Sequence, residues 1–395
     1  MQSQQGVTAN PQVLGRAQAL CEVLRTARGQ IEAGRELPAQ VVGALHDARM
    51  FRLLLPRAVG GEEIDLVTMA EVTRLIAAAD ASTAWCLGQG GGCAMTASFL
   101  EPEAAKRLFG PANAVLAWGA GVQGTAVEEG NGYRISGRWT FASGSRHATL
   151  LGAHCKIVGA NGKPRLRADG RPADLTALFP RAKAEMDDIW HVVGLKGTGS
   201  DSYEVKDLFV AASDTVDRED MASAKVDGTL FKFPNGMAYS AAFGGVSLGI
   251  ARGMLDDLTA LATQKTPRGA SSSLLDSGMF QGELGRLEAR WRAARALLLE
   301  TVGSVWSDVD AGSPLTLQHR VDWRLAATHA INEACQVSVE AYRAAGQNAI
   351  FQNAPFEQRL RDAMSAAQQV QGRATHFMTV GRHLLGLEPD TMMFL

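Results

Sequence analysis

The 395-residue chain has few cysteines, few aromatic residues and no excess of charge of either sign. Its five cysteines are an odd number without a Cys-x-x-Cys pair, which argues against a disulfide framework or a zinc site and favours a reducing cytoplasm. With 39 basic and 41 acidic residues, the net charge of −2 gives no reason to expect binding to nucleic acid or an anionic membrane. A content of 46% hydrophobic but only 6% aromatic residues is typical of a soluble, Ala- and Leu-rich helical protein.

Targeting and cofactor motifs are missing as well. The first residues contain no basic segment followed by an apolar run, and no stretch of about 18 apolar residues occurs, so we expect neither secretion nor a membrane span. The eight histidines are scattered without a His-x3-His or Glu-x-x-His pair, so no metal site is predicted. No Gly-x-Gly-x-x-Gly unit follows a predicted strand, which argues against a Rossmann-type nicotinamide site in this chain.

The hydrophobic pattern divides the chain into three parts. Apolar residues recur at helical spacing over residues 1–112, short runs bounded by Gly and Asn are typical of strands over 113–225, and helical spacing returns over 226–395. We therefore expect an α+β protein with an N-terminal helical domain, a central antiparallel β domain and a C-terminal four-helix bundle. The bundle helices are predicted over residues 239–263, 274–310, 315–345 and 354–387.

Four motifs resemble those of the acyl-CoA dehydrogenase superfamily and follow one another in the same order. They are the turn at 54–61 (LLPRAVGG), the helix start at 80–85 (DASTAW), the strand at 132–144 (GYRISGRWTFASG) and the turn at 194–200 (GLKGTGS). The resemblance covers nearly the whole chain. It implies the helix–sheet–helix fold of that superfamily, a flavin cofactor, and a homotetramer assembled through the C-terminal bundle.

The catalytic carboxylate of the dehydrogenases is missing. The resemblance puts Gln371 where dehydrogenases usually keep the Glu that removes the substrate α-proton, and an amide cannot accept a proton near neutral pH. Some superfamily members keep this Glu in the first bundle helix, where residues 243–258 contain only Asp256 and Asp257 near the far end. The sequence therefore points away from acyl-CoA dehydrogenation.

The predicted flavin strand favours the branch of reduced-flavin-dependent monooxygenases, such as the 4-hydroxyphenylacetate and dibenzothiophene oxygenase components. Phe141 stands where dehydrogenases usually keep a Thr beside flavin N5, and Ser143 lies two residues on. The resemblance implies that Trp139 and Phe141 contact the flavin and that Ser143 hydrogen-bonds around N5 or the substrate, in a site that excludes water. The alternative is that Trp139 and Phe141 are core residues and Ser143 a turn residue.

The turn at 194–200 is a second expected cofactor contact. In the resembling monooxygenases a tryptophan before this turn, here Trp190, tends to lie by the flavin. Gly197 and Thr198 would bring backbone amides close to the ring. As the alternative, the glycines only shape a β turn.

Contacts to the flavin phosphates are expected near the far end of the bundle. The resemblance points to Arg268, after the first bundle helix, and to Gly346 and Asn348 in a turn similar to the family's Gly-Gly-Asn-Gly-Phe. A basic residue at a helix C-terminus is often only a complement to the helix dipole. The sequence does not separate FAD from FMN.

A glycine-rich helix is the expected substrate site. Residues 85–93 (WCLGQGGGC) contain four glycines, each of which costs up to about 1 kcal/mol relative to Ala inside a helix. In the resembling monooxygenases this helix faces the flavin and substrate, so Trp85, Gln89 and Gly92 are predicted to bind substrate. With Gln89 as the only polar residue among these glycines, we expect a small neutral aromatic compound held by shape. Close helix packing is the alternative reason for the glycines.

The histidine that acts as a base in related phenol hydroxylases is also replaced in this chain. Related hydroxylases carry a His in the last helix where this chain has Gln368, with Gln371 one turn further on. A phenol needs a base to form phenolate, and an amide cannot serve. Either His376 takes this role, or the substrate is electron-rich, like an indole, and needs only hydrogen bonds. His376 can equally be a structural histidine between helices.

The sequence thus predicts the oxygenase component of a two-component flavin-dependent monooxygenase that uses O2 to hydroxylate a small aromatic or heteroaromatic compound, with an indole-like ring favoured. Reduced FAD or FMN would come from a separate NAD(P)H-dependent reductase. Two alternatives are an acyl-CoA dehydrogenase or oxidase with a displaced catalytic base, and a flavin-binding or scaffold protein without activity.

Overall fold

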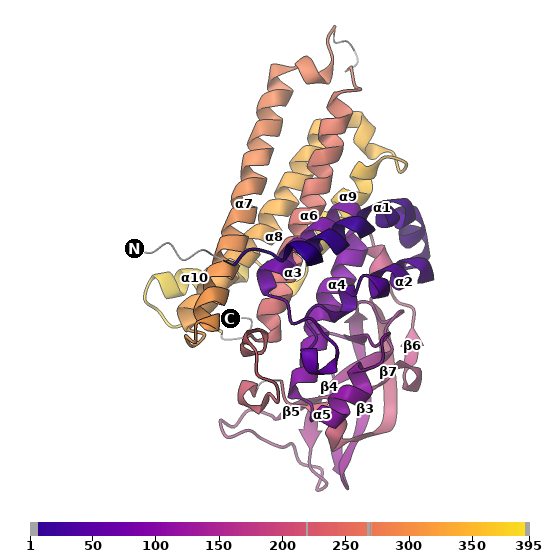
Figure 1. Cartoon of the computed structure of the whole chain (residues 1–395), viewed down its shortest axis with the longest axis vertical. Coiled ribbons are helices and arrows are strands. Elements are labelled where there is room, and N and C mark those ends of the chain that lie inside the picture. Colours follow the sequence, from indigo (N-terminus) through magenta and orange to yellow (C-terminus); the bar gives the residue numbers. More distant parts are fainter. Residues whose placement is uncertain (1–6, 219, 267–268, 270, 392–395) are drawn as a thin grey trace.

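The computed structural model describes residues 7–218, 220–266, 269 and 271–391. Its elements follow the expected order of helices, strands and helices, and the helices from both ends of the chain lie together above the sheet (Figure 1). Among the described residues, no helix is both long and apolar enough to cross a bilayer. In the same part of the chain, no group of His, Cys, Asp and Glu side chains is placed to hold a metal ion.

The N-terminal helices begin at residues that can cap them. Asn10 Oδ1 accepts from the backbone N–H groups of Gln12 and Val13, and Asp65 and Asp80 cap the next long helices through the N–H groups of the third residue. The helices are α1 (Pro11–Gly34), α2 (Ala39–Asp47), α3 (Leu66–Ala79), α4 (Ala81–Ala94) and α5 (Pro102–Phe109).

The strands form one eight-stranded sheet of order β6-β7-β3-β2-β4-β5-β8, with β1 paired to β4. The sheet is mixed, so the expectation of an antiparallel domain is wrong in two places: β4 runs parallel to both β1 and β2. The reason is that β2 and β3 form a hairpin, after which the chain crosses back and β4 enters on the far side of β2. The strands are β1 (Leu116–Trp118), β2 (Gly124–Glu129), β3 (Gly132–Ala142), β4 (Leu150–Val158), β5 (Asp174–Pro180), β6 (Glu185–Asp187), β7 (Asp201–Ala211) and β8 (Thr215–Val216).

The C-terminal part begins with three long helices, as predicted, but the fourth is broken. The chain forms a short 3-10 turn, Val370–Gly372, between α9 and α10. The Gln369 side chain accepts from the backbone N–H of Gln371, and Gly372 packs so closely on Ala367 and Ile331 that a side chain would not fit. The bundle helices are α6 (Asn235–Ala262), α7 (Gly278–Asp310), α8 (Leu317–Ala345), α9 (Pro355–Ala367) and α10 (Thr375–Leu384).

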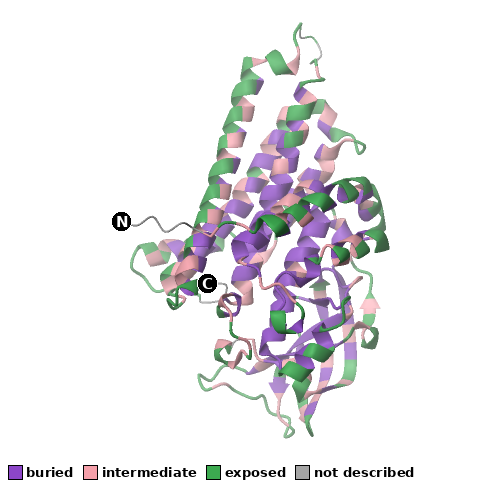
Figure 2. Ribbon diagram, in the orientation of Figure 1, coloured by how far each residue is buried: buried purple, intermediate pink, exposed green. Residues whose placement is uncertain are grey.

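Helices from before and after the sheet share one core, seen as the continuous buried region in Figure 2. The closest approach is between α3 and α6, where glycines of α6 face the α3 backbone. A Cβ on Gly245 would lie 2.2 Å from the Ala70 carbonyl oxygen, and one on Gly249 would lie 2.3 Å from the Arg74 carbonyl oxygen. Glycine is therefore required at these two positions for the helices to pack.

Gly245→Ala is expected to destabilise the protein by about 1–3 kcal/mol, because the added methyl group overpacks this contact. Gly236→Ala in the same helix is the matched control, since a Cβ there meets nothing within 4 Å. Removing a helical glycine should leave this control unchanged or stabilise it by up to about 1 kcal/mol. Urea unfolding curves measure both, and an equal stability of the two variants would contradict the packing.

Candidate active site

Phe141 is held out of the sheet by a strained backbone. It has φ +62°, a left-handed conformation that is rare for a bulky residue, and the register of β3 with β7 shifts between Trp139 and Ala142. Its side chain is 63% exposed, and the edge-on ring of Trp190 lies 6.0 Å away between centroids. Strain of this kind costs about 1–3 kcal/mol and is common at ligand sites. The Phe141–Trp190 pair thus offers an exposed aromatic surface.

Trp139 does not share that surface. Its side chain is 0% exposed, its indole N–H donates to the His154 carbonyl oxygen (3.0 Å), and its ring stacks on Tyr203. The expectation that Trp139 contacts a flavin is therefore corrected: the residue belongs to the core of the sheet. The β-bulge explains the difference, because it breaks the alternation of faces between Trp139 and Phe141.

Three hydroxyl groups, which we call the hydroxyl chain, join α4, β3 and the turn at 194–200. Ser143 Oγ lies 2.6 Å from Ser200 Oγ, which lies 2.7 Å from Thr198 Oγ1. The Trp85 indole N–H donates to Ser143 Oγ (3.0 Å) at one end, and Thr198 Oγ1 donates to the Leu195 carbonyl oxygen (2.8 Å) at the other. The structure therefore brings together Trp85, Ser143 and Thr198, which the sequence analysis selected separately.

The turn at 194–200 is fastened to the bundle by a buried carboxylate that sequence reasoning missed. Asp362 of α9 is 5% exposed and accepts from the Leu195 backbone N–H (2.6 Å). Burial, together with the charges of Asp80 and Glu32, raises the pKa of Asp362 to about 7. Leu195 itself has φ +52°, so this hydrogen bond holds a strained residue in place.

The glycines of the same turn allow close contacts. A Cβ on Gly197 would lie 2.1 Å from Ile31 Cγ2 of α1, and one on Gly194 would lie 2.2 Å from the Arg361 carbonyl oxygen. Gly197 therefore packs against the N-terminal helix. This packing explains the conformation of the turn without a cofactor contact, while the expected approach of Gly197 to the flavin stays a prediction.

Three stacked rings form an aromatic wall between α4 and α6, made of Trp85, Phe243 and Tyr239. Trp85 stacks on Phe243 with centroids 4.1 Å apart, and Phe243 stacks on Tyr239 at 5.8 Å. Gly92 makes room for this wall, since a Cβ there would lie 2.3 Å from Tyr239 Cε1. Sequence reasoning missed Phe243 and Tyr239, although their spacing of four residues places both on one face of α6.

The outer end of the aromatic wall is polar and neutral. Gln89 Nε2 donates to the Tyr239 hydroxyl over a long 3.4 Å, and Cys93 Sγ lies 3.5 Å from the same hydroxyl. Burial raises the pKa of Tyr239 well above its usual value and that of Cys93 to about 12. Both groups therefore stay protonated near neutral pH, and the Gln89 carbonyl oxygen accepts no hydrogen bond from any described residue.

A cation lies nearer to this end than the sequence suggested. The Arg218 guanidinium lies over the Trp118 ring, 4.7 Å from its centroid, and donates to Thr176 Oγ1 (2.8 Å). Its positive charge lowers the pKa values of Cys93 and Tyr239, partly offsetting the effect of burial. Sequence reasoning missed Arg218, because it comes from the distant segment after β8.

The C-terminal candidates are not brought to the hydroxyl chain within one chain. His376 lies on α10, on the opposite side of the bundle from α4 and β3 (Figure 1). Its Nε2 lies 2.7 Å from the Val370 carbonyl oxygen, and burial lowers its pKa. Gln371 is buried and accepts from Arg324, while Gln368 is exposed at the end of α9. Within one chain, these contacts are those of structural residues.

The expected phosphate contacts lie at the far end of the bundle. Gly346 is exposed with φ +63°, and Lys265 Nζ donates to the Ala345 carbonyl oxygen beside it (2.7 Å). Asn348 is half-buried in the same turn. Arg268 lies outside the described residues. The structure thus joins the ends of α6 and α8, at the opposite end of the molecule from the sheet that contains β3 (Figure 1).

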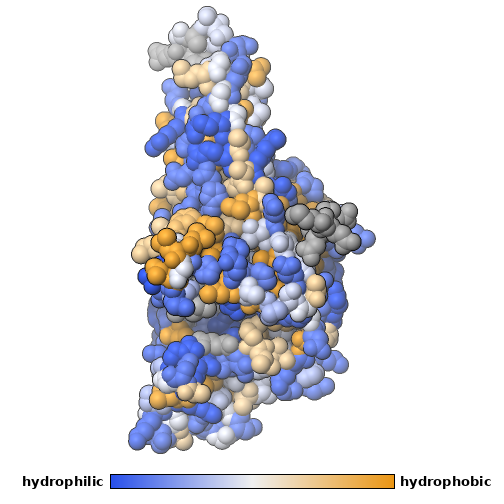
Figure 3. Space-filling view, turned by 90° about the vertical axis from the view of Figure 1, so that its left-hand side faces the viewer, coloured by the Kyte–Doolittle hydropathy of each residue, from blue (hydrophilic) through white to orange (hydrophobic). Residues whose placement is uncertain are grey.

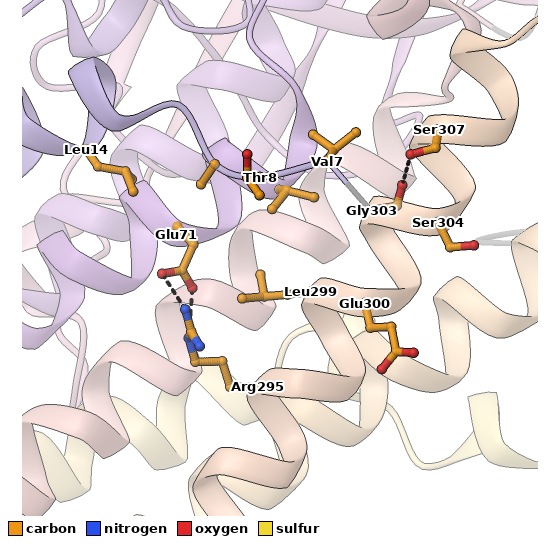
Figure 4. A pocket seen from close by; sticks show the side chains of 12 residues that line it. Val7, Thr8, Leu14, Glu71, Arg295, Leu299, Glu300, Gly303, Ser304 and Ser307 are labelled. Carbon is orange, nitrogen blue, oxygen red and sulfur yellow. Dashed lines mark hydrogen bonds and ion pairs between the residues drawn. The ribbon is translucent and has the colours of Figure 1, made fainter. Parts of the chain in front are cut away.

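A groove of about 560 Å³ lies elsewhere, between the N-terminal segment, α3 and α7 (Figure 4). Its lining includes Val7, Leu299 and the ion pair of Glu71 with Arg295. Burial raises the pKa of Glu71, but hydrogen bonds from Arg74 and Arg295 outweigh this effect and lower the pKa overall. No predicted site residue lines the groove, so the candidate active site is the region around Ser143.

The order of helices, mixed sheet and helical bundle is the arrangement that the resemblance to the acyl-CoA dehydrogenase superfamily implies. Residues 241–372 match the family model described as acyl-CoA dehydrogenase, C-terminal domain. The chain is 29% identical over 368 residues to the indole-3-acetate monooxygenase of Pseudomonas putida, covering 92% of this chain and 91% of the relative.

Two further comparisons agree. The chain is 26% identical over 394 residues to the oxygenase component of the FADH(2)-dependent resorcinol hydroxylase of Rhizobium sp. (strain MTP-10005), covering 95% of each. The crystal structure of the 3-HSA hydroxylase from Rhodococcus sp. RHA1 matches with a TM-score of 0.88 and 24% identity, covering 97% of this chain and 99% of that one. The predicted resemblance and fold are confirmed: the chain is a homologue of flavin-dependent monooxygenases, which are oxidoreductases.

Proposed function

We propose that the protein is the oxygenase component of a two-component flavin-dependent monooxygenase that hydroxylates a planar heteroaromatic compound with an indole-like ring. The observation that carries the proposal is the position of Ser143. It follows Phe141 of the exposed aromatic pair by two residues, and its hydroxyl group is hydrogen-bonded to Trp85 of the aromatic wall and to Ser200. A flat cofactor and a flat substrate would both find an aromatic surface and a polar atom there.

Reduced flavin, as FAD or FMN, fits the exposed side of this region. The Phe141 ring is held outward by its strained backbone and offers a surface for the isoalloxazine ring, with Trp190 at its edge. Ser143 would lie at flavin N5, as the resemblance implies. The bound flavin would supply the two electrons with which O2 delivers one oxygen atom to the substrate and the other to water. A separate reductase would supply the reduced flavin.

The substrate side favours a ring that carries an N–H group. The aromatic wall is apolar and buried at Trp85 and Phe243, and the Gln89 amide nitrogen donates to Tyr239, so the Gln89 carbonyl oxygen would accept a hydrogen bond from a substrate N–H. Tyr239 and Cys93 stay protonated, so neither would take the proton of a phenol. The Arg218 charge would favour a carboxylate on the ring's side chain, as in an indole acid. An indole-type compound fits these groups better than a phenol.

A homotetramer is part of the proposal. The face in Figure 3, on which α10 lies, carries an apolar patch that stays open to solvent among the described residues of one chain. Gly346 and Asn348 directly follow α8, whose end lies at the opposite end of the molecule from the sheet (Figure 1), so a phosphate contact from them would reach the flavin of a neighbouring chain. The exposed apolar residues of α10 and the turn after it are Phe377, Met378, Leu384, Leu385 and Leu387.

The proposal is tested with reduced FMN or FAD, O2 and an unrelated flavin reductase. We expect hydroxylation of indole and indole-3-acetate ahead of phenols, and a light-scattering mass of four 42.0 kDa chains. Short and medium acyl-CoA thioesters should not bleach bound oxidised flavin under anaerobic conditions. Steady bleaching would instead support an acyl-CoA dehydrogenase with a displaced base, and exclusive turnover of phenolic acids would contradict the proposed substrate.

A further inference from the structure

The proton positions in the hydroxyl chain follow from requiring each of its contacts to be a hydrogen bond. A carbonyl oxygen only accepts, so the 2.8 Å contact between Thr198 Oγ1 and the Leu195 oxygen uses the single proton of Thr198. The 2.7 Å contact of Thr198 with Ser200 then uses the proton of Ser200. By the same reasoning, the 2.6 Å contact of Ser200 with Ser143 uses the proton of Ser143. Only this assignment makes all three contacts hydrogen bonds.

The other end of the hydroxyl chain has a fixed direction too. An indole N–H only donates, so Trp85 occupies one lone pair of Ser143 Oγ. Ser143 therefore has its proton directed at Ser200, one lone pair directed at Trp85, and one lone pair left. In this state Ser143 offers a ligand an acceptor and no donor. All three hydroxyl groups are buried, so water does not readily disturb the assignment.

Residues that are not part of the hydroxyl chain maintain the direction of its hydrogen bonds. The Leu195 carbonyl group is held by the Asp362 bond to the N–H of the same residue and by the Trp190 indole N–H (3.1 Å). A displacement of Leu195 would free the Thr198 proton and, through Ser200, the Ser143 proton. The bundle helix α9 thus acts on Ser143 through four hydrogen bonds in series.

We propose that Ser200 and Thr198 are positioning residues that make the site select reduced over oxidised flavin. This inference rests on the proposed function, in which Ser143 lies at flavin N5. Reduced flavin carries an N–H group at N5, which the free lone pair of Ser143 accepts. Oxidised flavin has only a lone pair at N5. This lone pair would face the lone pair of Ser143, so no hydrogen bond would form. An oxygenase component that exchanges flavin with a reductase needs this preference, because oxidised flavin competes for the site.

The test is the ratio of the dissociation constants of oxidised and reduced FMN or FAD, measured anaerobically with the whole protein. In Ser200→Ala the Ser143 proton loses its acceptor and can turn toward N5, so oxidised flavin should bind more tightly and reduced flavin more weakly. We expect the ratio to fall about tenfold, which is about 30 mV in the two-electron midpoint potential of bound flavin. Thr198→Val should change the ratio in the same direction, and Ser200→Thr should restore it.

Ser145→Ala is the matched control, because Ser145 Oγ is buried and donates to the Gly199 carbonyl oxygen (3.3 Å) outside the hydroxyl chain. Its ratio should equal that of the unaltered protein. A normal ratio in Ser200→Ala and Thr198→Val, beside a changed one in Ser143→Ala, would overturn the inference but leave the proposed site standing. An unaltered protein that binds no flavin would overturn the proposed function as well.

Discussion

Replacing Gly92 by alanine is expected to lower kcat/KM for hydroxylation about 100-fold while flavin still binds. The new Cβ would lie 2.3–2.8 Å from three atoms of the Tyr239 ring, so the ring must move by about an ångström. The displacement would separate the Tyr239 hydroxyl from Gln89 and shift the aromatic wall against which the proposed substrate would lie. Misplacement of this size costs about 100-fold even without loss of a reacting group. Steady-state kinetics with an unrelated reductase measure the effect.

Gly90→Ala is the matched control for Gly92→Ala. It makes the same change in the same helix, but its Cβ would meet only Phe51 Cδ1, at 3.9 Å, an ordinary contact. We expect kcat/KM within about threefold of the unaltered protein, since the added methyl group displaces nothing and raises helix propensity. Equal losses in the two variants would mean that α4 tolerates an added methyl group at neither glycine, and the glycines would then indicate helix packing alone.

The sequence was sufficient for the parts of the site that lie in contiguous motifs. The strand ending at Ser143, the turn containing Thr198 and the helix starting near Trp85 each have a recognisable local pattern, and the resemblance fixed their order. The structure adds that their side chains bond to one another. Ser200 was within the quoted turn but was not selected, because a serine in a Gly-rich turn has no distinctive local signal.

Contacts between distant segments could not be predicted from the sequence. Tyr239 and Asp362 act in the site only because α6 and α9 pack beside α4 and the turn at 194–200, and no local pattern distinguishes them from other helical residues. The misassigned role of Trp139 has another cause. Alternation along a strand predicts that Trp139 and Phe141 share a face, and the β-bulge between them reverses that relation.

The prediction of one continuous last helix was wrong for a similar reason. Residues 354–387 have helical spacing throughout, so the pattern alone favours one helix. The break at Val370–Gly372 depends on Gly372 fitting against Ile331 of α8 and on the Gln369 side chain closing the turn. Consequently the candidates Gln371 and His376 do not continue along α9. Gln371 instead accepts from Arg324, and His376 Nε2 lies beside the Val370 carbonyl oxygen.

Asp362→Asn should remove a large pH dependence of stability. The folded-state pKa of Asp362 is about 7, above the usual aspartate value near 4, because of burial and the charges of Asp80 and Glu32, opposed by the Leu195 hydrogen bond and Arg361. Between these two values the folded state binds a proton that the unfolded state has lost. The contribution of Asp362 is therefore most favourable below pH 4 and falls by about 1.4 kcal/mol per unit, or about 4 kcal/mol in all, up to pH 7.

An asparagine cannot titrate, and its side-chain oxygen still accepts from the Leu195 N–H. The difference in free energy of unfolding between the unaltered protein and Asp362→Asn should accordingly shift by about 4 kcal/mol in favour of the variant between pH 4 and pH 7. Asp256→Asn is the control, because Asp256 is an exposed carboxylate of α6 paired with Arg252. Urea unfolding at half-unit pH steps measures all three proteins. Parallel curves of unfolding free energy against pH for Asp362→Asn and the unaltered protein would contradict the raised pKa of Asp362. The Leu195 N–H would then be hydrogen-bonded to an ordinary charged carboxylate.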